Sequence, residues 1–328
     1  MGNINVLFSA PYMLPYRERF TPVFQHYGLD LIVPEVQERM DAEQILAYAG
    51  QFDGTVCGDD RYTPEVLRSC SPRLKVISKW GTGIDSIDKE YAASLGIQVC
   101  RTINAFSVPV SDSVLGYILA FARYQPWMDR AIKAGEWEKM PGRSLSECTL
   151  GVIGVGHIGK EVLRKAHAFG MNLLANDIIP ISEEFTSPLG VRMVRLEELL
   201  SQSDFISLNC DLNPTSLLLV NHDSLALVKP GAVIINTARG PIIDENALVQ
   251  ALTEGRLGGA ALDVFKVEPL PLESPLRAID NVMLAAHNSN SSPSAWEKVH
   301  WNTILNLLDG LRIPHADFEE VKKNTPQV

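Results

Sequence analysis

The sequence is poor in cysteine and has fewer basic than acidic residues, and both features narrow the possible functions. Its five cysteines are widely spaced and include no CxxC pair, so neither a disulfide scaffold nor a zinc-binding motif is expected. The histidines form no HExxH motif, and we predict no metal site. Lysine and arginine number 29 against 39 acidic residues, and the net charge of −10 argues against nucleic acid as a partner.

Long apolar runs are also missing. A typical run, residues 115–122, is far shorter than the ~20 residues that cross a bilayer. The first ten residues lack the basic segment of a signal peptide, so we expect a cytoplasmic protein without a membrane partner. Hydrophobic residues make up 46% and charged residues 21% of the 328 residues, which is typical of a globular chain. At ~100–200 residues per domain, this length predicts two domains.

Short β-like runs alternate with helical segments, a pattern typical of parallel α/β sheets. We predict two Rossmann-like, doubly wound parallel-sheet domains with the active site in the cleft between them. Residues 110–135 are expected to form a helical region interrupted by Pro126, residues 293–311 a last helix, and the polar segment 319–328 a loosely held tail. The expected strands lie at residues 4–9, 29–33, 55–58, 74–78, 97–100, 149–154, 172–176, 204–209, 232–236, 259–263 and 282–285.

A glycine motif in the middle of the chain indicates a nucleotide site. Gly154, Gly156 and Gly159 form GxGxxG between an expected strand and an expected helix. The first glycine would allow a tight turn, the second a close approach of the pyrophosphate, and the third close helix–strand packing. Asp177 follows the next strand and would bind the ribose hydroxyls, which favours NAD over NADP. The alternative is a glycine-rich turn that merely packs, with Asp177 as an acidic loop residue.

The position of this motif predicts the domain order. A substrate domain is expected at residues 1–103, the NAD-binding domain at 104–287, and the returning part of the substrate domain at 288–328. Three charged or titratable residues, Arg239, Glu268 and His287, follow the last three expected strands of the second series. Because parallel strands end at one edge of a sheet, these side chains can converge. Taken singly, each could instead be a solvated charge or a structural residue.

Their chemistry suits the reduction of a 2-oxo acid. His287 as imidazolium could donate a proton to the carbonyl oxygen, and as neutral imidazole it could remove the proton in the reverse direction. Glu268 could hydrogen-bond the other ring nitrogen and favour the charged ring. Arg239 offers a planar fork of donors to carboxylate and carbonyl oxygens.

Together these segments resemble the NAD-dependent D-2-hydroxyacid dehydrogenases, closest to their phosphoglycerate dehydrogenase-like branch. The matching stretches are 79–85, the glycine motif with Asp177, 236–240, 261–269 and His287. The resemblance implies catalytic roles for Arg239, Glu268 and His287. It implies substrate contacts by Lys79, Trp80, Gly81 and Arg239, and cofactor contacts by Gly154, Gly156, His157, Ile158, Gly159, Asp177, Cys210, Thr237, Ala238, Asp263 and His287.

The family resemblance implies hydride transfer between NAD(H) and a small, anionic D-2-hydroxy or 2-oxo acid. Family members are commonly dimeric through the cofactor domain, so a homodimer that uses residues 111–135 is expected. The alternative is an NAD(H)-responsive binding protein of the corepressor type, with weak or no turnover. Such a protein would need a peptide-docking groove in its first domain and long disordered flanks.

Two stretches depart from the family pattern. Residues 288–292 read Asn-Ser-Asn-Ser-Ser where the family usually has a glycine-rich stretch. Residues 57–60 read Cys-Gly-Asp-Asp where the phosphoglycerate enzymes carry a basic residue, so a phosphate would need Lys79 and Arg61 to supply charge. The substrate therefore need not be phosphoglycerate. The Trp80 ring could be plain core or could face the substrate.

Overall fold

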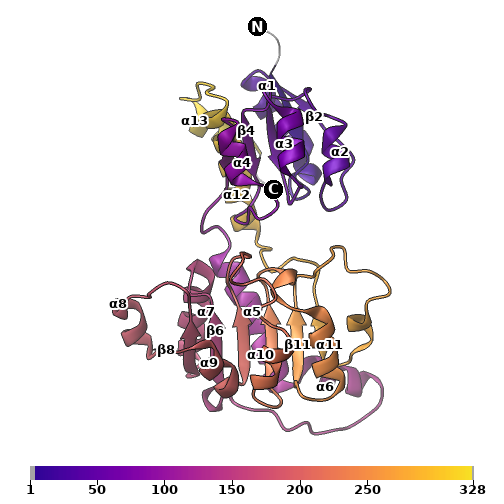
Figure 1. The fold of residues 1–328 in the computed structure, drawn as a ribbon, viewed down its shortest axis with the longest axis vertical. Helices are drawn as coiled ribbons and strands as arrows, with labels where there is room; N and C mark the ends of the chain where they lie inside the picture. The colour runs from indigo at the N-terminus through magenta and orange to yellow at the C-terminus, as the bar shows by residue number, and fades with distance from the viewer. Residues whose placement is uncertain (1–3, 327–328) are drawn as a thin grey trace. The chain divides into compact units, whose positions relative to one another are not determined.

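The computed structural model describes residues 4–326, which divide into two compact units (Figure 1). Unit 1 comprises Met1–Ala105 and Ser292–Val328, and unit 2 comprises Phe106–Ser291. The ends of the predicted substrate domain, residues 1–3 and 327–328, lie outside the described residues. Each unit contains one parallel sheet, so the predicted fold class of two parallel-sheet α/β domains is confirmed.

Unit 1 is built on a five-stranded sheet with the order β2-β1-β3-β4-β5. All its strands run parallel, and their carboxyl ends therefore share one edge. Its strands are β1 (Ile4–Phe8), β2 (Leu29–Ile32), β3 (Gly54–Cys57), β4 (Val76–Lys79) and β5 (Gln98–Cys100). Its helices are α1 (Arg17–His26), α2 (Ala42–Leu46), α3 (Pro64–Cys70), α4 (Lys89–Ser94), α12 (Pro293–Gly310) and α13 (Phe318–Asn324).

Helix α12 packs very closely on the middle of this sheet. A Cβ on Gly54 would lie 2.8 Å from the Leu307 side chain, and a Cβ on Gly310 would lie 2.3 Å from the Val76 side chain. Ser78 also donates a hydrogen bond of 2.7 Å to the Thr303 carbonyl oxygen. The last part of the chain thus completes the core of the first unit. The expectation of a loose tail from residue 319 was wrong, because α13 forms there and Phe318 is buried.

Unit 2 has a seven-stranded parallel sheet with the order β12-β11-β10-β9-β6-β7-β8. The two-residue edge strand β8 was not among the predicted strands. The strands are β6 (Thr149–Ile153), β7 (Asn172–Asn176), β8 (Arg192–Met193), β9 (Phe205–Leu208), β10 (Val233–Asn236), β11 (Gly259–Leu262) and β12 (Val282–Leu284). The helices are α5 (Ser107–Arg123), α6 (Gln125–Lys133), α7 (His157–Ala168), α8 (Glu183–Thr186), α9 (Leu196–Gln202), α10 (His222–Leu227) and α11 (Glu245–Thr253).

Two hydrophobic clusters cover the two faces of the unit 2 sheet, as in a doubly wound fold. Ile234 belongs to the cluster that includes residues of α9, α10 and α11, whereas its strand neighbours Val233 and Ile235 belong to the cluster with α5 and α7. The predicted break near Pro126 is confirmed. Helix α5 ends and α6 begins at Tyr124, whose φ of 51° is left-handed.

The boundary between the units falls later than the predicted residue 287. Asn288 and Ser289 donate their backbone N–H groups to the Asp263 carboxylate, at 2.8 and 3.0 Å, and this ties them to unit 2. Residues 288–291 therefore belong to unit 2, and the return to unit 1 begins at Ser292.

Candidate active site

The loop between β6 and α7 has a backbone that depends on glycine. Gly154 has a φ of 89°, and a Cβ there would lie 2.6 Å from the backbone nitrogen of Cys210. A Cβ on Gly159 would lie 2.0 Å from the Gly154 carbonyl oxygen, so α7 packs directly on the turn. A Cβ on Gly156, the N-cap of α7, would meet nothing within 4 Å, and no side chain caps this helix end. The loop thus offers a pyrophosphate the space and the helix N-terminus that it needs.

A pocket of about 280 Å³ adjoins this loop. Asp177 lies on its wall, with Oδ2 accepting a hydrogen bond of 2.6 Å from the N–H of Val155 and Oδ1 accepting one of 3.0 Å from Ile179. Each carboxylate oxygen can accept more than one hydrogen bond, so ribose hydroxyls can still be bound. The lining comprises Ile153, Gly154, Gly156, Asn176, Asp177, Ile178, Ile179, Asn209, Cys210, Asp211, Asn213, Thr215, Ser216 and Leu219.

Among the buried polar atoms of unit 2 that have no hydrogen-bond partner within the described part of the chain, two directly follow the neighbouring strands β9 and β10. They are Asn209 Oδ1, on a residue that lines the pocket, and Thr237 Oγ1, at the end of β10. Such atoms are costly unless a ligand or water satisfies them. Burial raises the pKa of Cys210 to about 11, so its neutral thiol adds no negative charge to the pocket at neutral pH. The residues present therefore fit a dinucleotide.

The structure joins two of the predicted catalytic side chains. The Nδ1 atom of His287 lies 3.0 Å from Oε2 of Glu268, and both side chains are largely buried. The other oxygen of Glu268 accepts a hydrogen bond of 2.9 Å from the backbone N–H of Phe265. The carboxylate is thus held from both sides, which fixes the orientation of the imidazole ring.

His287 stands on a constrained turn. Its φ is 48°, in the left-handed region that few non-glycine residues occupy, and its backbone N–H donates 2.8 Å to the Asp263 carbonyl oxygen. Asp263 is 2% exposed, and its carboxylate binds the next two N–H groups, those of Asn288 and Ser289. The carboxylate of Asp263, a predicted cofactor contact, thus also shapes the His287 turn.

The loop that carries Arg239 contacts the loop that carries Glu268 through Gly240. A Cβ on Gly240 would lie 1.9 Å from the backbone carbon of Phe265, so the loops after β10 and β11 touch through their main chains. Arg239 donates a hydrogen bond of 2.8 Å to the Ala238 carbonyl oxygen, and its own carbonyl oxygen accepts one of 2.8 Å from Asn236. Of the remaining predicted cofactor contacts, His157 is exposed and Ile158 packs against the core.

The predicted substrate loop, residues 79–81, lies in unit 1 at the end of β4. The Trp80 N–H donates a hydrogen bond of 2.9 Å to the Cys57 carbonyl oxygen, and the ring is 2% exposed. Its indole Nε1 donates 2.8 Å to Nδ1 of His300. Both N–H groups of Trp80 are thus engaged within unit 1, and a contact of Trp80 with the substrate stays a prediction. Gly81 has a φ of 110°, and its carbonyl oxygen accepts a hydrogen bond from Thr102.

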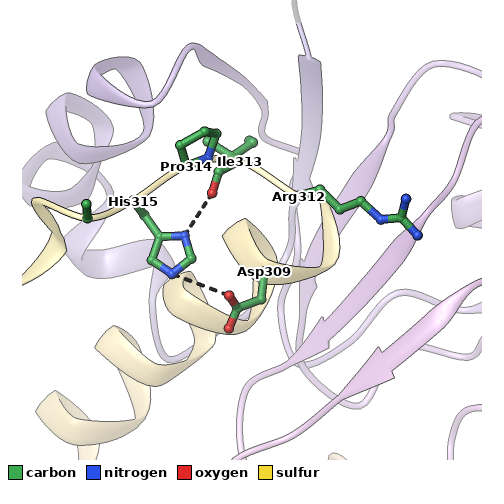
Figure 2. Close-up of a pocket in the computed structure, with 6 residues that line it drawn as sticks. Asp309, Arg312, Ile313, Pro314 and His315 are labelled. Carbon is green, nitrogen blue, oxygen red and sulfur yellow. Dashed lines mark hydrogen bonds and ion pairs between the residues drawn. The ribbon is translucent and has the colours of Figure 1, made fainter.

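A larger hollow in unit 1 contains none of the predicted site residues. It lies at the turn after α12 (Figure 2) and has a volume of about 420 Å³. Both nitrogens of its His315 are engaged locally, with the Ile313 carbonyl oxygen at 2.8 Å and Asp309 at 3.3 Å. Because its histidine is used to close the turn, we assign no function to this hollow.

Within residues 4–326, no group of three or more His, Cys, Asp or Glu side chains is placed to hold a metal ion. In the same range, no helix has the length and the apolar character needed to span a bilayer.

Residues 115–289 match the family model described as D-isomer specific 2-hydroxyacid dehydrogenase, NAD binding domain. This match covers more than half of the chain and lies within unit 2. The chain belongs to the D-2-hydroxyacid dehydrogenase family. NAD is therefore the cofactor, as the sequence predicted.

The match with this chain covers different shares of the length of its relatives in the dehydrogenase family. The chain is 37% identical to the glyoxylate reductase of Korarchaeum cryptofilum over 78% of this chain and 80% of the relative. It is 38% identical to the D-3-phosphoglycerate dehydrogenase of Methanocaldococcus jannaschii, over 80% of this chain but only 50% of that protein. Among solved structures, it is similar to the D-lactate dehydrogenase from Aquifex aeolicus complexed with NAD and lactic acid, with a TM-score of 0.82, 26% identity and 98% coverage of both chains.

Two residues of the candidate site were not predicted from the sequence. Asn209 lines the nucleotide pocket directly before the predicted Cys210, and its position at the end of β9 was the available signal. The Phe265 N–H orients Glu268, but a backbone donor carries no mark in the sequence.

Proposed function

We propose that this chain reduces small, anionic 2-oxo acids with NADH and catalyses the reverse oxidation of D-2-hydroxy acids. The observation that carries the proposal is the hydrogen bond between His287 and Glu268, in the same unit as the NAD-binding loop. The similarity to proteins named glyoxylate reductase and hydroxypyruvate reductase supports the substrate class. None of the relatives compared above is named a corepressor, and no observation favours that alternative.

In the proposed mechanism, NADH supplies the hydride. His287 donates the proton from Nε2 to the carbonyl oxygen of the substrate, since Nδ1 faces Glu268. Glu268 stabilises the imidazolium and keeps the ring in place, because its other oxygen is bound to the Phe265 N–H. In the reverse direction, neutral His287 accepts the hydroxyl proton at the same atom.

Arg239 binds the carboxylate and polarises the carbonyl of the substrate, a task for which a planar guanidinium is suited. Gly81 contributes a backbone contact to the carboxylate. The Gly154–Gly159 loop binds the pyrophosphate, Asp177 the adenosine ribose, and the unpartnered Thr237 hydroxyl is available to NAD. The predicted contacts of His157, Ile158, Cys210 and Ala238 with NAD remain part of this proposal.

The direct test follows NADH oxidation by the purified chain with glyoxylate, pyruvate, hydroxypyruvate and phenylpyruvate. Steady turnover of at least one acid that His287→Asn abolishes supports the proposal. NADH binding without turnover of any 2-oxo acid would refute it.

We further propose that the chain works in the cytoplasm as a homodimer. All five cysteines are free thiols, which suits a reducing compartment. Apolar side chains on and after α6 are exposed, with Ile132 51% and Trp137 85% exposed. Such side chains on one segment are typical of a surface that is covered in an assembly.

A further inference from the structure

Lys79 is a buried cation at the carboxyl end of β4. It is 4% exposed, and its ammonium group donates a hydrogen bond of 2.9 Å to the Trp80 carbonyl oxygen. Its charge is met by Asp59 Oδ1, at 3.2 Å. Asp59 lies two residues beyond β3, which pairs with β4, and its side chain is 33% exposed. The charge of Lys79, the cation of the predicted substrate loop, is therefore neutralised by Asp59 within unit 1.

A second carboxylate, that of Asp60, adds negative charge beside Lys79 and Asp59. Asp60 is fully buried, and its carboxylate accepts a hydrogen bond of 2.9 Å from the Met40 N–H and another from the Ser9 hydroxyl. Burial raises the pKa of Asp60 to about 6, so it is largely ionised at neutral pH. The group formed by Lys79, Asp59 and Asp60 then has a net negative charge.

We propose that Asp59 determines the substrate class of this chain by neutralising Lys79, so that the chain takes 2-oxo acids without a phosphoryl group. This inference rests on the proposed reduction of 2-oxo acids. A phosphoryl dianion near the end of β4 would lie in the field of two carboxylates and one ammonium group, whose summed charge is negative and repels it. An uncharged substituent of the substrate meets no such cost.

The aromatic neighbours of the loop add no positive charge. Tyr12 stacks on the Trp80 ring with centroids 4.3 Å apart, and Trp296 meets the Trp80 ring edge-on at 6.1 Å. Two other cations follow the strands β5 and β3, which flank β4. Arg101 donates a hydrogen bond of 3.0 Å to the Thr82 carbonyl oxygen, on the β5 side of the loop, and Arg61 is exposed. If either of them bound a phosphoryl group, the wild type would prefer phosphorylated acids.

The test compares hydroxypyruvate with 3-phosphohydroxypyruvate, which differ only in the phosphoryl group, by their kcat/KM values with NADH. Glyoxylate and pyruvate serve as additional unphosphorylated acids. The variants are Asp59→Asn, which frees the Lys79 charge, and Asp59→Asn with Lys79→Met, which removes it again. Asp53→Asn is the matched control, because Asp53 pairs with Arg73 at 3.1 Å near the other end of β3 and is 27% exposed.

We expect the wild type to use the phosphorylated acid about tenfold or more less well than its best unphosphorylated acid. Asp59→Asn should raise the relative kcat/KM for the phosphorylated acid by about tenfold or more, the added Lys79→Met should cancel the gain, and Asp53→Asn should leave the ratio unchanged. Thermal melting and NADH binding verify that each variant is folded, and Asp59→Ser replaces Asp59→Asn if that variant is not.

A wild-type preference for the phosphorylated acid would overturn the inference, as would an unchanged ratio in a folded Asp59 variant. Should neither Asp59 variant fold, the wild-type preference alone decides. Absence of turnover with every 2-oxo acid would instead refute the proposed function itself.

Discussion

The indole N–H of Trp80 donates a hydrogen bond to Nδ1 of His300, 2.8 Å away in space and 220 residues away in sequence. His300 is 1% exposed, and the ring of Phe20 meets its ring edge-on at 5.5 Å. Burial lowers the pKa of His300 to about 4, against the opposing effect of Glu297 and with a smaller contribution from Arg19. The neutral ring is thus the form that the core of unit 1 requires, because a protonated Nδ1 could not accept the Trp80 hydrogen.

Acid should therefore destabilise unit 1 through His300. Because the folded pKa is below the unfolded value, the stabilising contribution is present above about pH 6.5 and is lost as the pH falls through about 4. A difference of this size corresponds to about 3 kcal/mol. Denaturant unfolding between pH 4 and 7, followed by tryptophan fluorescence, measures the effect. In His300→Asn, which does not titrate, this part of the pH dependence should disappear; an unchanged profile would contradict the assignment.

His287→Asn should reduce the turnover of the best 2-oxo acid by ~10²–10⁴-fold, the range of general acid catalysis, and leave NADH affinity largely intact. Asparagine tolerates the left-handed backbone that His287 adopts, so the turn should survive the substitution. Steady-state rates and NADH titration by fluorescence check both statements. Near-normal turnover would mean that His287 is not the proton donor.

Glu268→Gln should have a different signature. Glutamine retains a hydrogen-bond partner for the ring but loses the charge that stabilises the imidazolium. Reduction rates should fall at neutral pH and recover in part in acid. A pH–rate profile compared with that of the wild type tests this, and a uniform loss at every pH would indicate misplacement of the ring instead.

Asp177→Ala should weaken NADH binding and relax the discrimination against NADPH, since a carboxylate that repels a 2′-phosphate is removed. Part of the lost NADH affinity should come from the loop itself, because Asp177 also accepts the Val155 N–H. The measurement is the ratio of kcat/KM for the two cofactors. If the variant kept the wild-type ratio, another group would have to bind the ribose.

Alanine at Gly156 and Gly159 should separate binding from folding. At Gly159 a Cβ would meet backbone at 2.0 Å, so the loop must shift and unit 2 should lose about 2 kcal/mol or more of stability. At Gly156 a Cβ meets no protein atom within 4 Å, so the fold should be stable while the approach of the pyrophosphate is blocked. Thermal melting and NADH titration distinguish the two. Equal melting temperatures with Gly159→Ala would contradict the packing argument.

Trp137→Glu combined with Ile132→Asp should convert the proposed homodimer into monomers, because two exposed apolar side chains are replaced by charges. Light scattering at micromolar concentration gives the mass. Leu272→Glu is a suitable control, as Leu272 is 82% exposed in a loop far along the chain from α6. A wild-type monomer would refute the proposal directly.

The parts of the fold that were predictable are those with local signals. The glycine motif, the apolar strands and the break near Pro126 each depend on residues within a short window, and the structure has them where expected. Strand β8 has only two residues and two exposed side chains, so it leaves no apolar pattern to detect. The role of Trp80 depends on His300, a partner 220 residues away, and no spacing rule connects them.

The close fit of α12 on Gly54 and Val76 has a consequence for synthesis on the ribosome. Residues 293–310 are translated after all of unit 2, so one face of the unit 1 sheet lacks its covering helix until then. Unit 2 consists of one continuous segment, so it can fold before α12 has been synthesised and added to the unit 1 sheet. Unit 1 is therefore translated first but completed last. Its sheet, which lacks α12 on one face during synthesis, is the part of the nascent chain that a chaperone would most need to protect.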